Sequence, residues 1–267
     1  MSLKIKVLGS SSSGNATLIW NSKGGVLIDC GFTLRNMTEK LEEINLSFKD
    51  ISCLLISHMH SDHVNNAVIN RLVNENIQIL LNYKLLAPIR QKYSAINKAV
   101  KKGLVKLFNE EELIVNGFRI KNFQVPHDSH GGCYGFNIVY NGQKISIATD
   151  IGYSDNSIIE RFYNSDLIVL ESNHDDEMLH NSGRPHMLIE RIKNIGHLSN
   201  EQCGEILSTV AENSENIPKQ IILAHLSKEC NTHDKAMNIV SVALKDKIDS
   251  ENIYTAHHSK GSEILEV

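Results

Sequence analysis

The sequence predicts an α/β protein, because short apolar runs of strand-like character alternate with amphipathic segments of helical period. The chain has 267 residues, of which 41% are hydrophobic and 22% are charged, a composition typical of a globular protein with a sizeable core. The apolar runs are short and rich in Val, Ile and Leu. Strands interleaved with helices are typical of layered α/β folds.

The expected elements follow one another from the start of the chain. Strands are predicted at residues 5–8 and 16–20, on either side of a serine-rich loop at residues 10–15. Helical periodicity predicts helices at residues 65–74, 157–163, 200–214 and 235–245. No Pro-, Gly- or Ser-rich linker divides the chain, and it contains only four prolines. We therefore expect a single domain over residues 1–267.

Composition also excludes several classes of protein. No run of about 18 apolar residues occurs, and the N-terminus lacks the features of a signal peptide, so neither a membrane span nor a secreted protein is predicted. The cysteines are scattered and form no C-x-x-C pair: Cys30, Cys53, Cys133, Cys203 and Cys230. This pattern favours buried, reduced thiols in a cytoplasmic protein over disulfides or a thiolate zinc site. The net charge of −4 does not indicate a nucleic-acid binder, although a local basic patch remains compatible with one.

Histidines and carboxylates follow the apolar runs at the points where the runs end. Asp29 follows residues 26–28 and His58 follows residues 53–57. The same placement recurs at His127, Asp150, Glu171 and His225. In layered α/β folds the carboxyl ends of the strands meet at one edge, where rigid strands direct side chains into a common cleft. We therefore expect these residues to form one polar site.

The centre of this site is predicted in the segment His58-Met59-His60-Ser61-Asp62-His63. A tight loop leaving the preceding strand can arrange its ligand side chains around a pair of ions, with a helix beginning near Val64. Burial of so many ionisable groups without a metal would be costly. Imidazole and carboxylate ligands without a thiolate suit Zn²⁺, Mn²⁺ or Fe²⁺, and the sequence does not choose among these ions.

Together with LIDCG around Asp29, VPHD around His127, ATDIG around Asp150 and AHLS around His225, this HxHxDH segment resembles the ordered motifs of the metallo-β-lactamase superfamily. The resemblance covers essentially the whole chain. It implies the fold of that superfamily, a four-layer αβ/βα sandwich, and with it a metal-dependent hydrolase.

The resemblance also implies a ligand set. One divalent ion would be held by His58, His60 and His127, the other by Asp62, His63 and His225, and Asp150 would bridge the two. Asp29 would hydrogen-bond the metal-binding loop from behind. Two such ions would supply a hydroxide nucleophile at neutral pH, which Asp62 would orient as well.

Glu171 and His197 bear on which bond is cleaved. Both resemble positions used by phosphodiesterase branches of the superfamily, in which a carboxylate-supported histidine assists at the scissile phosphate. A protonated His197 would stabilise developing charge or protonate the leaving oxygen. The alternative is an ordinary surface histidine at the start of a helix, because Leu198, Ser199 and Asn200 follow it.

A finer resemblance joins SSSSGNATLI, LIDCGFTLRN, LESNHDDEML, RIKNIGHLSNEQ and LAHLSKECN to the YycJ/WalJ group within this superfamily. That resemblance implies a 5′-to-3′ exonuclease acting on double-stranded DNA, with a link to DNA repair. The short stretches around Asp150 leave no room for the long arm of tRNA-processing relatives or the second domain of RNA-cleaving ones. Fold alone does not determine the substrate.

A basic segment at residues 76–109 favours a polyanionic substrate, because it contains no acidic residue. Its cations are Lys84, Arg90, Lys92, Lys98, Lys101, Lys102 and Lys106. Tyr83, Tyr93 and Phe108 lie among them, and exposed aromatic rings can stack on bases. This pattern is equally compatible with two interpretations. The segment is either a surface that binds a nucleic-acid backbone or a solvated helix face.

Several alternatives remain open from the sequence. The same metal site would serve a phosphodiesterase of RNA or of a small molecule, or a thioester or lactone hydrolase; a non-catalytic redox protein is disfavoured because His60 is present. Residues 10–15 form either a phosphate-binding turn or a plain connection. His130 and His174 lie near site residues in the sequence, whereas exposed or locally bonded side chains are expected for His180, His186, His233, His257 and His258.

Overall fold

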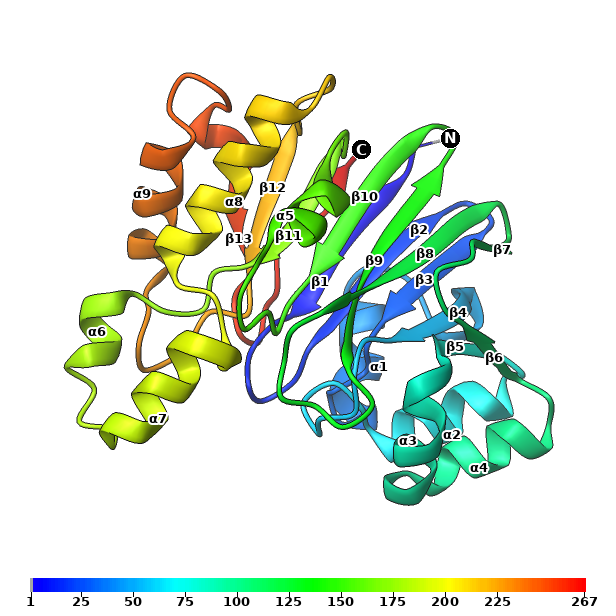
Figure 1. Ribbon diagram of the computed structural model, residues 1–267. Coiled ribbons are helices and arrows are strands. Elements are labelled where there is room, and N and C mark those ends of the chain that lie inside the picture. The colour runs from blue at the N-terminus through cyan, green and yellow to red at the C-terminus, as the bar shows by residue number, and fades with distance from the viewer. Residues whose placement is uncertain (1) are drawn as a thin grey trace.

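The computed structural model describes residues 2–267, and over these residues the chain forms two seven-stranded sheets with helices on their outer sides (Figure 1). The first sheet has the order β14-β1-β2-β3-β4-β5-β6. Its strands are β1 (Lys4–Gly9), β2 (Ala16–Asn21), β3 (Gly24–Ile28), β4 (Ile51–Ile56), β5 (Gln78–Asn82), β6 (Val105–Phe108) and β14 (Leu265–Glu266).

The second sheet has the order β13-β12-β11-β10-β9-β8-β7. Its strands are β7 (Leu113–Val115), β8 (Phe118–Val125), β9 (Cys133–Tyr140), β10 (Gln143–Ala148), β11 (Leu167–Glu171), β12 (Gln220–Ala224) and β13 (Ile253–Thr255). The helices are α1 (Leu34–Glu42), α2 (Asn66–Asn74), α3 (Leu86–Lys92), α4 (Ser94–Lys101), α5 (Asn156–Ile159), α6 (Asp176–His180), α7 (His186–Arg191), α8 (Asn200–Asn213) and α9 (His233–Ala243).

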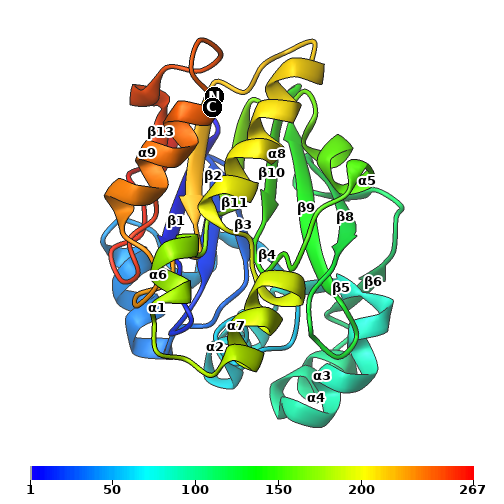
Figure 2. The ribbon, with the colours of Figure 1, turned by 60° about the vertical axis from the view of Figure 1, so that its left-hand side comes forward.

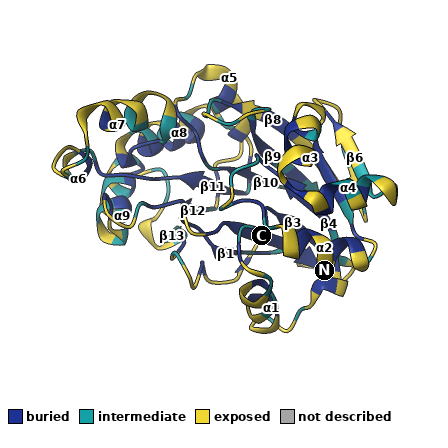
Figure 3. Cartoon of the chain, turned by 90° about the horizontal axis from the view of Figure 1, so that it is seen from below, coloured by how far each residue is buried: buried dark blue, intermediate teal, exposed yellow. Residues whose placement is uncertain are grey.

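The hydrophobic core confirms the predicted four-layer sandwich. One cluster of buried side chains joins the two sheets to each other and to α1, α2 and α4, and another joins the second sheet to α5, α8 and α9. Strand β11 shows the period of two that this layering requires, since Leu167 and Val169 belong to the first cluster and Ile168 and Leu170 to the second. Figure 2 shows α8 and α9 across the second sheet, and Figure 3 shows buried strands beneath partly exposed helices.

Capping residues explain where the helices begin. The predicted helix at residues 65–74 is confirmed as α2, where the Asn65 side chain accepts hydrogen bonds from two backbone N–H groups of the first turn. Ser199 caps α8 in the same way, which confirms the helix predicted at residues 200–214. The helix predicted at residues 235–245 begins earlier, at His233, because Thr232 caps it. The segment at residues 157–163 is not one α-helix: α5 gives way to a 3₁₀ turn at Glu160–Phe162.

Parallel pairing brings the strand ends that carry the predicted site residues together. β3, β4 and β5 are parallel neighbours in one sheet, and β10, β11 and β12 are parallel neighbours in the other. Asp29, Asp150 and His225, the residues that follow β3, β10 and β12, have left-handed φ angles of 58°, 60° and 57°. Such angles are unusual for residues other than glycine, and they are common at functional sites. Among residues 2–267, no helix has both the length and the apolar character needed to span a membrane.

Candidate metal centre

The HxHxDH loop leaves β4 at His58 and turns back on itself. The N–H groups of His63 and Val64 both donate to the His60 carbonyl, each at 3.1 Å. Gly31 lies directly against this loop, because a Cβ atom at position 31 would come within 1.7 Å of the Asp62 carbonyl oxygen. The glycine of the LIDCG motif is therefore required for the close approach of the loop.

Asp29 lies behind the loop and contacts both the end of β4 and the loop itself. Its Oδ1 accepts a hydrogen bond from the Ser57 N–H at 2.8 Å, and its Oδ2 accepts one from the Ser57 hydroxyl at 2.6 Å. The same Oδ2 lies 2.7 Å from Nδ1 of His63. Because both groups are buried, this contact orients the His63 ring and turns its Nε2 toward the centre of the site.

The serine-rich loop at residues 10–15 lies at the site and contributes groups that the sequence analysis did not assign. Nδ2 of Asn15 lies 3.3 Å from Oδ2 of Asp62 and 2.9 Å from Nε2 of His63. The Ser10 hydroxyl donates to Oδ1 of Asn15 and accepts from the backbone N–H of His225, both at 2.9 Å. The available signal is that this loop directly follows the strand at residues 5–8, so that it lies at the carboxyl end of that strand.

The structure brings the predicted ligands into two clusters in which the ligand atoms lie within 4.8 Å of one another. The first cluster comprises His58, His60 and His127, and the second cluster comprises Asp62, His63 and His225. Asp150 lies between them: its Oδ2 is 3.1 Å from Nε2 of His63, and its Oδ1 is 3.8 Å from Nε2 of His127. The resemblance to the superfamily implied the same grouping of these residues as metal ligands.

Buried polar atoms without partners show that these residues suit metal ions. Nε2 of His58 and Nε2 of His225 are buried without a hydrogen-bond partner among residues 2–267, and Oδ2 of Asp150 is buried with only its ion-pair contact to His63. Leaving such atoms unsatisfied is costly, and coordination of an ion would remove that cost. The donors are imidazole nitrogens and carboxylate oxygens, which suit Zn²⁺, Mn²⁺ or Fe²⁺. Burial raises the pKa of Cys133, next to His58, which favours the neutral thiol there.

The two clusters differ in their protonation. Burial lowers the pKa values of all three histidines of the first cluster, which keeps these rings neutral. Burial lowers the pKa values of His63 and His225 as well, but the surrounding carboxylates, Asp150 foremost, outweigh it. The pKa of His63 is raised well above its usual value, and that of His225 is raised to about 10. A metal entering the second cluster must displace these protons.

Glu171 connects the second cluster to His197. Its Oε1 lies 2.8 Å from Nδ1 of His197 and 2.8 Å from Nδ1 of His225. Its Oε2 accepts hydrogen bonds from the backbone N–H groups of Ile151 and Leu198. Burial raises the pKa of Glu171, but the two histidines outweigh it and lower the pKa to about 2. The carboxylate is therefore ionised and orients both rings.

His197 is not the surface helix cap that was considered as an alternative, because Ser199 caps α8. It follows a π-helical turn at Ile192–Gly196, a distortion that is frequent at functional sites. The same turn contacts the first cluster, since the Gly196 carbonyl lies 3.1 Å from Nδ1 of His127. The His197 side chain is 24% exposed, so it lies between the buried site and solvent.

The basic segment lies beside the first cluster but is less uniform than predicted. Tyr83 is 51% exposed, whereas Tyr93 and Phe108 are only 7% and 1% exposed. The stacking interpretation is therefore wrong for Tyr93 and Phe108, whose rings pack in the core. The cations of the segment are all exposed, but several of them bind other parts of the chain.

The remaining histidines lie apart from the two clusters. His174 is 1% exposed and its Nδ1 has no partner in the described chain, so its ring does not face the solvent. His233 and His257 stack with ring centroids 4.0 Å apart, and His258 binds the Leu226 carbonyl. His130, His180 and His186 are exposed, as expected for the last two.

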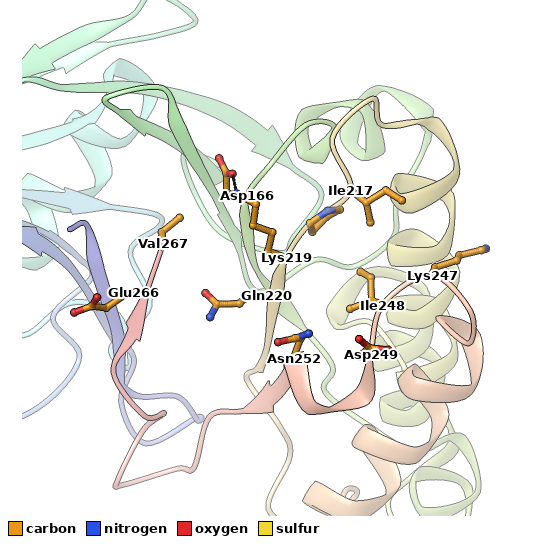
Figure 4. A pocket seen from close by; sticks show the side chains of 11 residues that line it. Asp166, Ile217, Lys219, Gln220, Lys247, Ile248, Asp249, Asn252, Glu266 and Val267 are labelled. Carbon is orange, nitrogen blue, oxygen red and sulfur yellow. Dashed lines mark hydrogen bonds and ion pairs between the residues drawn. The ribbon is translucent and has the colours of Figure 1, made fainter. Parts of the chain in front are cut away.

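A pocket of about 420 Å³ lies elsewhere in the molecule, near the amino ends of β11 and β12 (Figure 4). Asp166, Lys219 and Gln220 line it together with residues of the C-terminus. None of its lining residues belongs to either cluster. It therefore belongs to the edge of the sheet opposite the candidate metal centre.

An αβ/βα sandwich with two joined His/Asp clusters at the carboxyl ends of its strands defines a class of metal-dependent hydrolases. A family model described as "Beta-lactamase superfamily domain" matches residues 25–226. The chain belongs to the metallo-β-lactamase superfamily.

Individual relatives agree with this assignment. The chain is 30% identical over 242 residues to Exodeoxyribonuclease WalJ of Streptococcus pneumoniae, which covers 87% of this chain and 85% of the relative. It is 29% identical over 253 residues to Exodeoxyribonuclease YycJ of Bacillus anthracis, which covers 92% and 91% of the two chains. The solved structure of the metallo-β-lactamase fold protein YhfI from Bacillus subtilis superposes with a TM-score of 0.74 at 19% identity over the full length of both chains. This last likeness shows the shared fold.

Proposed function

We propose that this chain is a two-metal phosphodiesterase, and specifically an exonuclease that removes nucleotides from the 5′ end of double-stranded DNA. The observation that carries the proposal is the buried Glu171 carboxylate, which orients His197 beside the two clusters. A supported imidazole next to a metal site is suited to assist the departure of an oxygen leaving group. The exodeoxyribonucleases to which the chain is similar support DNA as the substrate.

In this proposal the first cluster would hold one divalent ion and the second cluster the other, with the Asp150 carboxylate between them. The ions are Zn²⁺, Mn²⁺ or Fe²⁺, whose donor preferences match the residues present. When bound, they would lower the pKa of water toward neutrality and polarise the scissile phosphate. The proposal places this activity in the cytoplasm, which the five free, buried cysteines support.

The side chains of the protein divide the remaining tasks. Asp62 is the only member of the second cluster with a partly exposed side chain, at 20%, so its carboxylate is available to orient the attacking water. Asp29 keeps His63 in place, and Glu171 keeps His225 in place. His197 uses Nδ1 for Glu171, which leaves Nε2 to donate a proton to the leaving oxygen.

The first test is cleavage of 5′-labelled linear duplex DNA by the purified protein with Mn²⁺, with Zn²⁺ and with a chelator. We expect stepwise loss of nucleotides that needs a metal and disappears in Asp62→Asn, which also serves as the control for a contaminating nuclease. Metal-dependent cleavage of a small phosphodiester without cleavage of DNA would favour the second candidate, a phosphodiesterase of RNA or of a small molecule. A thioester or lactone hydrolase would cleave neither.

His197→Ala tests the role of the imidazole. We expect a loss of about 100-fold on DNA, whose leaving oxygen needs a proton, and a much smaller loss on a nitrophenyl diester, whose leaving group does not. His186→Ala, which removes an exposed histidine on α7, is the matched control and should behave as the wild type. Equal losses on the two substrates would exclude His197 as the general acid.

A further inference from the structure

We propose that Lys92 binds a backbone phosphate of the DNA beside the first cluster, whereas Lys98 and Lys102 of the same basic segment serve the fold and do not contact DNA. The inference rests on the proposed function, because it names the part of the surface that holds the substrate. It divides a set of cations that look equivalent in the sequence.

Lys98 and Lys102 are already engaged by α2. Nζ of Lys98 donates to Oδ1 of Asn70 at 2.9 Å and to Oδ1 of Asn74 at 2.7 Å. Nζ of Lys102 donates to the Val73 carbonyl at 3.0 Å. Val73 and Asn74 form the last turn of α2, where free carbonyl groups and the helix dipole favour positive charge. These two lysines therefore join α4 to the end of α2.

The short helix α3 lies instead against the loops that carry the first cluster. At its start, a Cβ atom on Gly131 would lie 2.9 Å from the Lys84 carbonyl oxygen and 3.0 Å from Pro88, so the loop after His127 packs closely on it. At its end, Nζ of Lys92 donates to the Met59 carbonyl at 3.1 Å. Met59 lies between His58 and His60, so Lys92 is the cation of the basic segment that contacts the HxHxDH loop.

Lys92 retains the capacity to bind a ligand. The Tyr93 hydroxyl donates to the same Met59 carbonyl at 3.1 Å, so the loop has a second and largely buried support. Lys92 is exposed, and an ammonium group has three N–H donors, of which this contact uses one. A phosphate near His60 would meet a charged, accessible donor there. Tyr93 is thus the positioning residue for the loop, and Lys92 is the binding residue.

A phosphate contact has a measurable property that a structural contact lacks. Each lysine that neutralises a DNA phosphate releases a counterion, which contributes about 0.9 to the slope of log affinity against log salt concentration. A lysine that bonds only to asparagine side chains and a backbone carbonyl releases no counterion when DNA binds. The salt slope therefore separates the two roles.

The test compares Lys92→Gln with Lys98→Gln, since each removes one positive charge from the same segment. Binding is measured by fluorescence anisotropy with the metal-loaded protein and a duplex whose 5′ linkages are phosphorothioates. We expect Lys92→Gln to weaken binding about 5-fold at 0.1 M salt and to reduce the salt slope by about 0.9. Lys98→Gln should leave the slope unchanged and lower only the melting temperature.

Cleavage assays on the same proteins complete the comparison. For Lys92→Gln, the ratio of kcat/KM on duplex DNA to kcat/KM on a nitrophenyl diester should fall. An unchanged salt slope in Lys92→Gln, or an equal reduction in Lys98→Gln, would overturn the inference. A wild-type protein that cleaves no DNA would refute the proposed function. In that case the inference about Lys92 would stand only if duplex binding still showed a salt slope that depends on Lys92. It would fall if the protein bound no DNA.

Discussion

The two clusters of the candidate metal centre are supported in different ways. In the second cluster, Nδ1 of His63 contacts the Asp29 carboxylate and Nδ1 of His225 contacts the Glu171 carboxylate, at 2.7 and 2.8 Å. In the first cluster, Nδ1 of His127 contacts the Gly196 carbonyl at 3.1 Å, and Nδ1 of His58 contacts the Ser57 hydroxyl at 3.0 Å. Hydrogen bonds to charged groups are shorter and stronger than those to neutral groups. The second cluster is therefore the more rigidly oriented of the two.

The contrast extends to the surroundings of the clusters, although each contains both buried and partly exposed residues. His58, His63 and His225 are buried, whereas His60, His127 and Asp62 are partly exposed. The first cluster also lies beside Lys92 and the basic segment. The stronger hydrogen bonds of the second cluster and the cations beside the first cluster indicate different roles. The second cluster holds its ligands rigidly, and a substrate approaches the site from the side of the first cluster.

The largest expected effect that tests this contrast comes from Glu171→Gln. The amide would place an NH₂ group where the carboxylate now accepts hydrogen bonds from His225, His197 and two backbone N–H groups. Leaving buried donors without acceptors costs about 1–3 kcal/mol each. We expect a loss of about 100-fold or more in kcat/KM on DNA, together with a lower metal content measured by elemental analysis.

Glu190→Gln, an exposed change on α7, is the control for this variant and should leave both measurements as in the wild type. A loss below about 3-fold in Glu171→Gln would contradict the role of Glu171 as the common support of His225 and His197.

Asp29→Asn should have a smaller effect that falls mainly on the second cluster, because Asp29 reaches the first cluster only through the Ser57 hydroxyl. The amide retains an acceptor for some of the present donors but no longer offers a charged oxygen to His63. We expect the affinity for one of the two ions to fall about 10- to 100-fold, with turnover largely restored at saturating metal. Titration of metal into protein that a chelator has made metal-free measures the affinities of the two binding steps, and mainly one of them should be weakened. Equal weakening of both steps would show that the clusters are not supported independently.

The sequence predicted a polar site at one edge because His58, Asp150 and His225 come after strands that are parallel within each sheet. The carboxyl ends of such strands meet at one edge whatever the details of packing, so His58, Asp150 and His225 were expected to converge. His127 comes after the antiparallel strand β8, and the division of the ligands into two groups was implied by the resemblance to the superfamily. The layered fold was predictable for the same reason, since it depends on the alternation of strand and helix periods and not on particular contacts.

The supports of the site were less predictable, because they depend on tertiary contacts between distant segments. Asn15 reaches Asp62 only when the serine-rich loop and the HxHxDH loop lie side by side. Lys98 and Lys92 are both exposed lysines near the end of a helix, and only the packing of α4 on α2 and of α3 on the metal loop distinguishes them. Phe108 is likewise buried because its side chain belongs to the core cluster that joins the two sheets, which depends on tertiary packing.

The smallest expected effect concerns Cys133, which lies beside the first cluster. Its Sγ is 3.6 Å from Nδ1 of His58, and burial raises its pKa, so the group is a neutral thiol and a weak partner. In Cys133→Ala we expect activity within about 3-fold of the wild type and a free energy of unfolding lower by about 1 kcal/mol, from the lost packing of a buried side chain. Denaturant titration and the DNA assay measure the two quantities. A loss of metal affinity as large as that of Asp29→Asn would show that the first cluster depends on the neutral partners of His58 as strongly as the second cluster depends on its carboxylates, and the contrast between the clusters would fail.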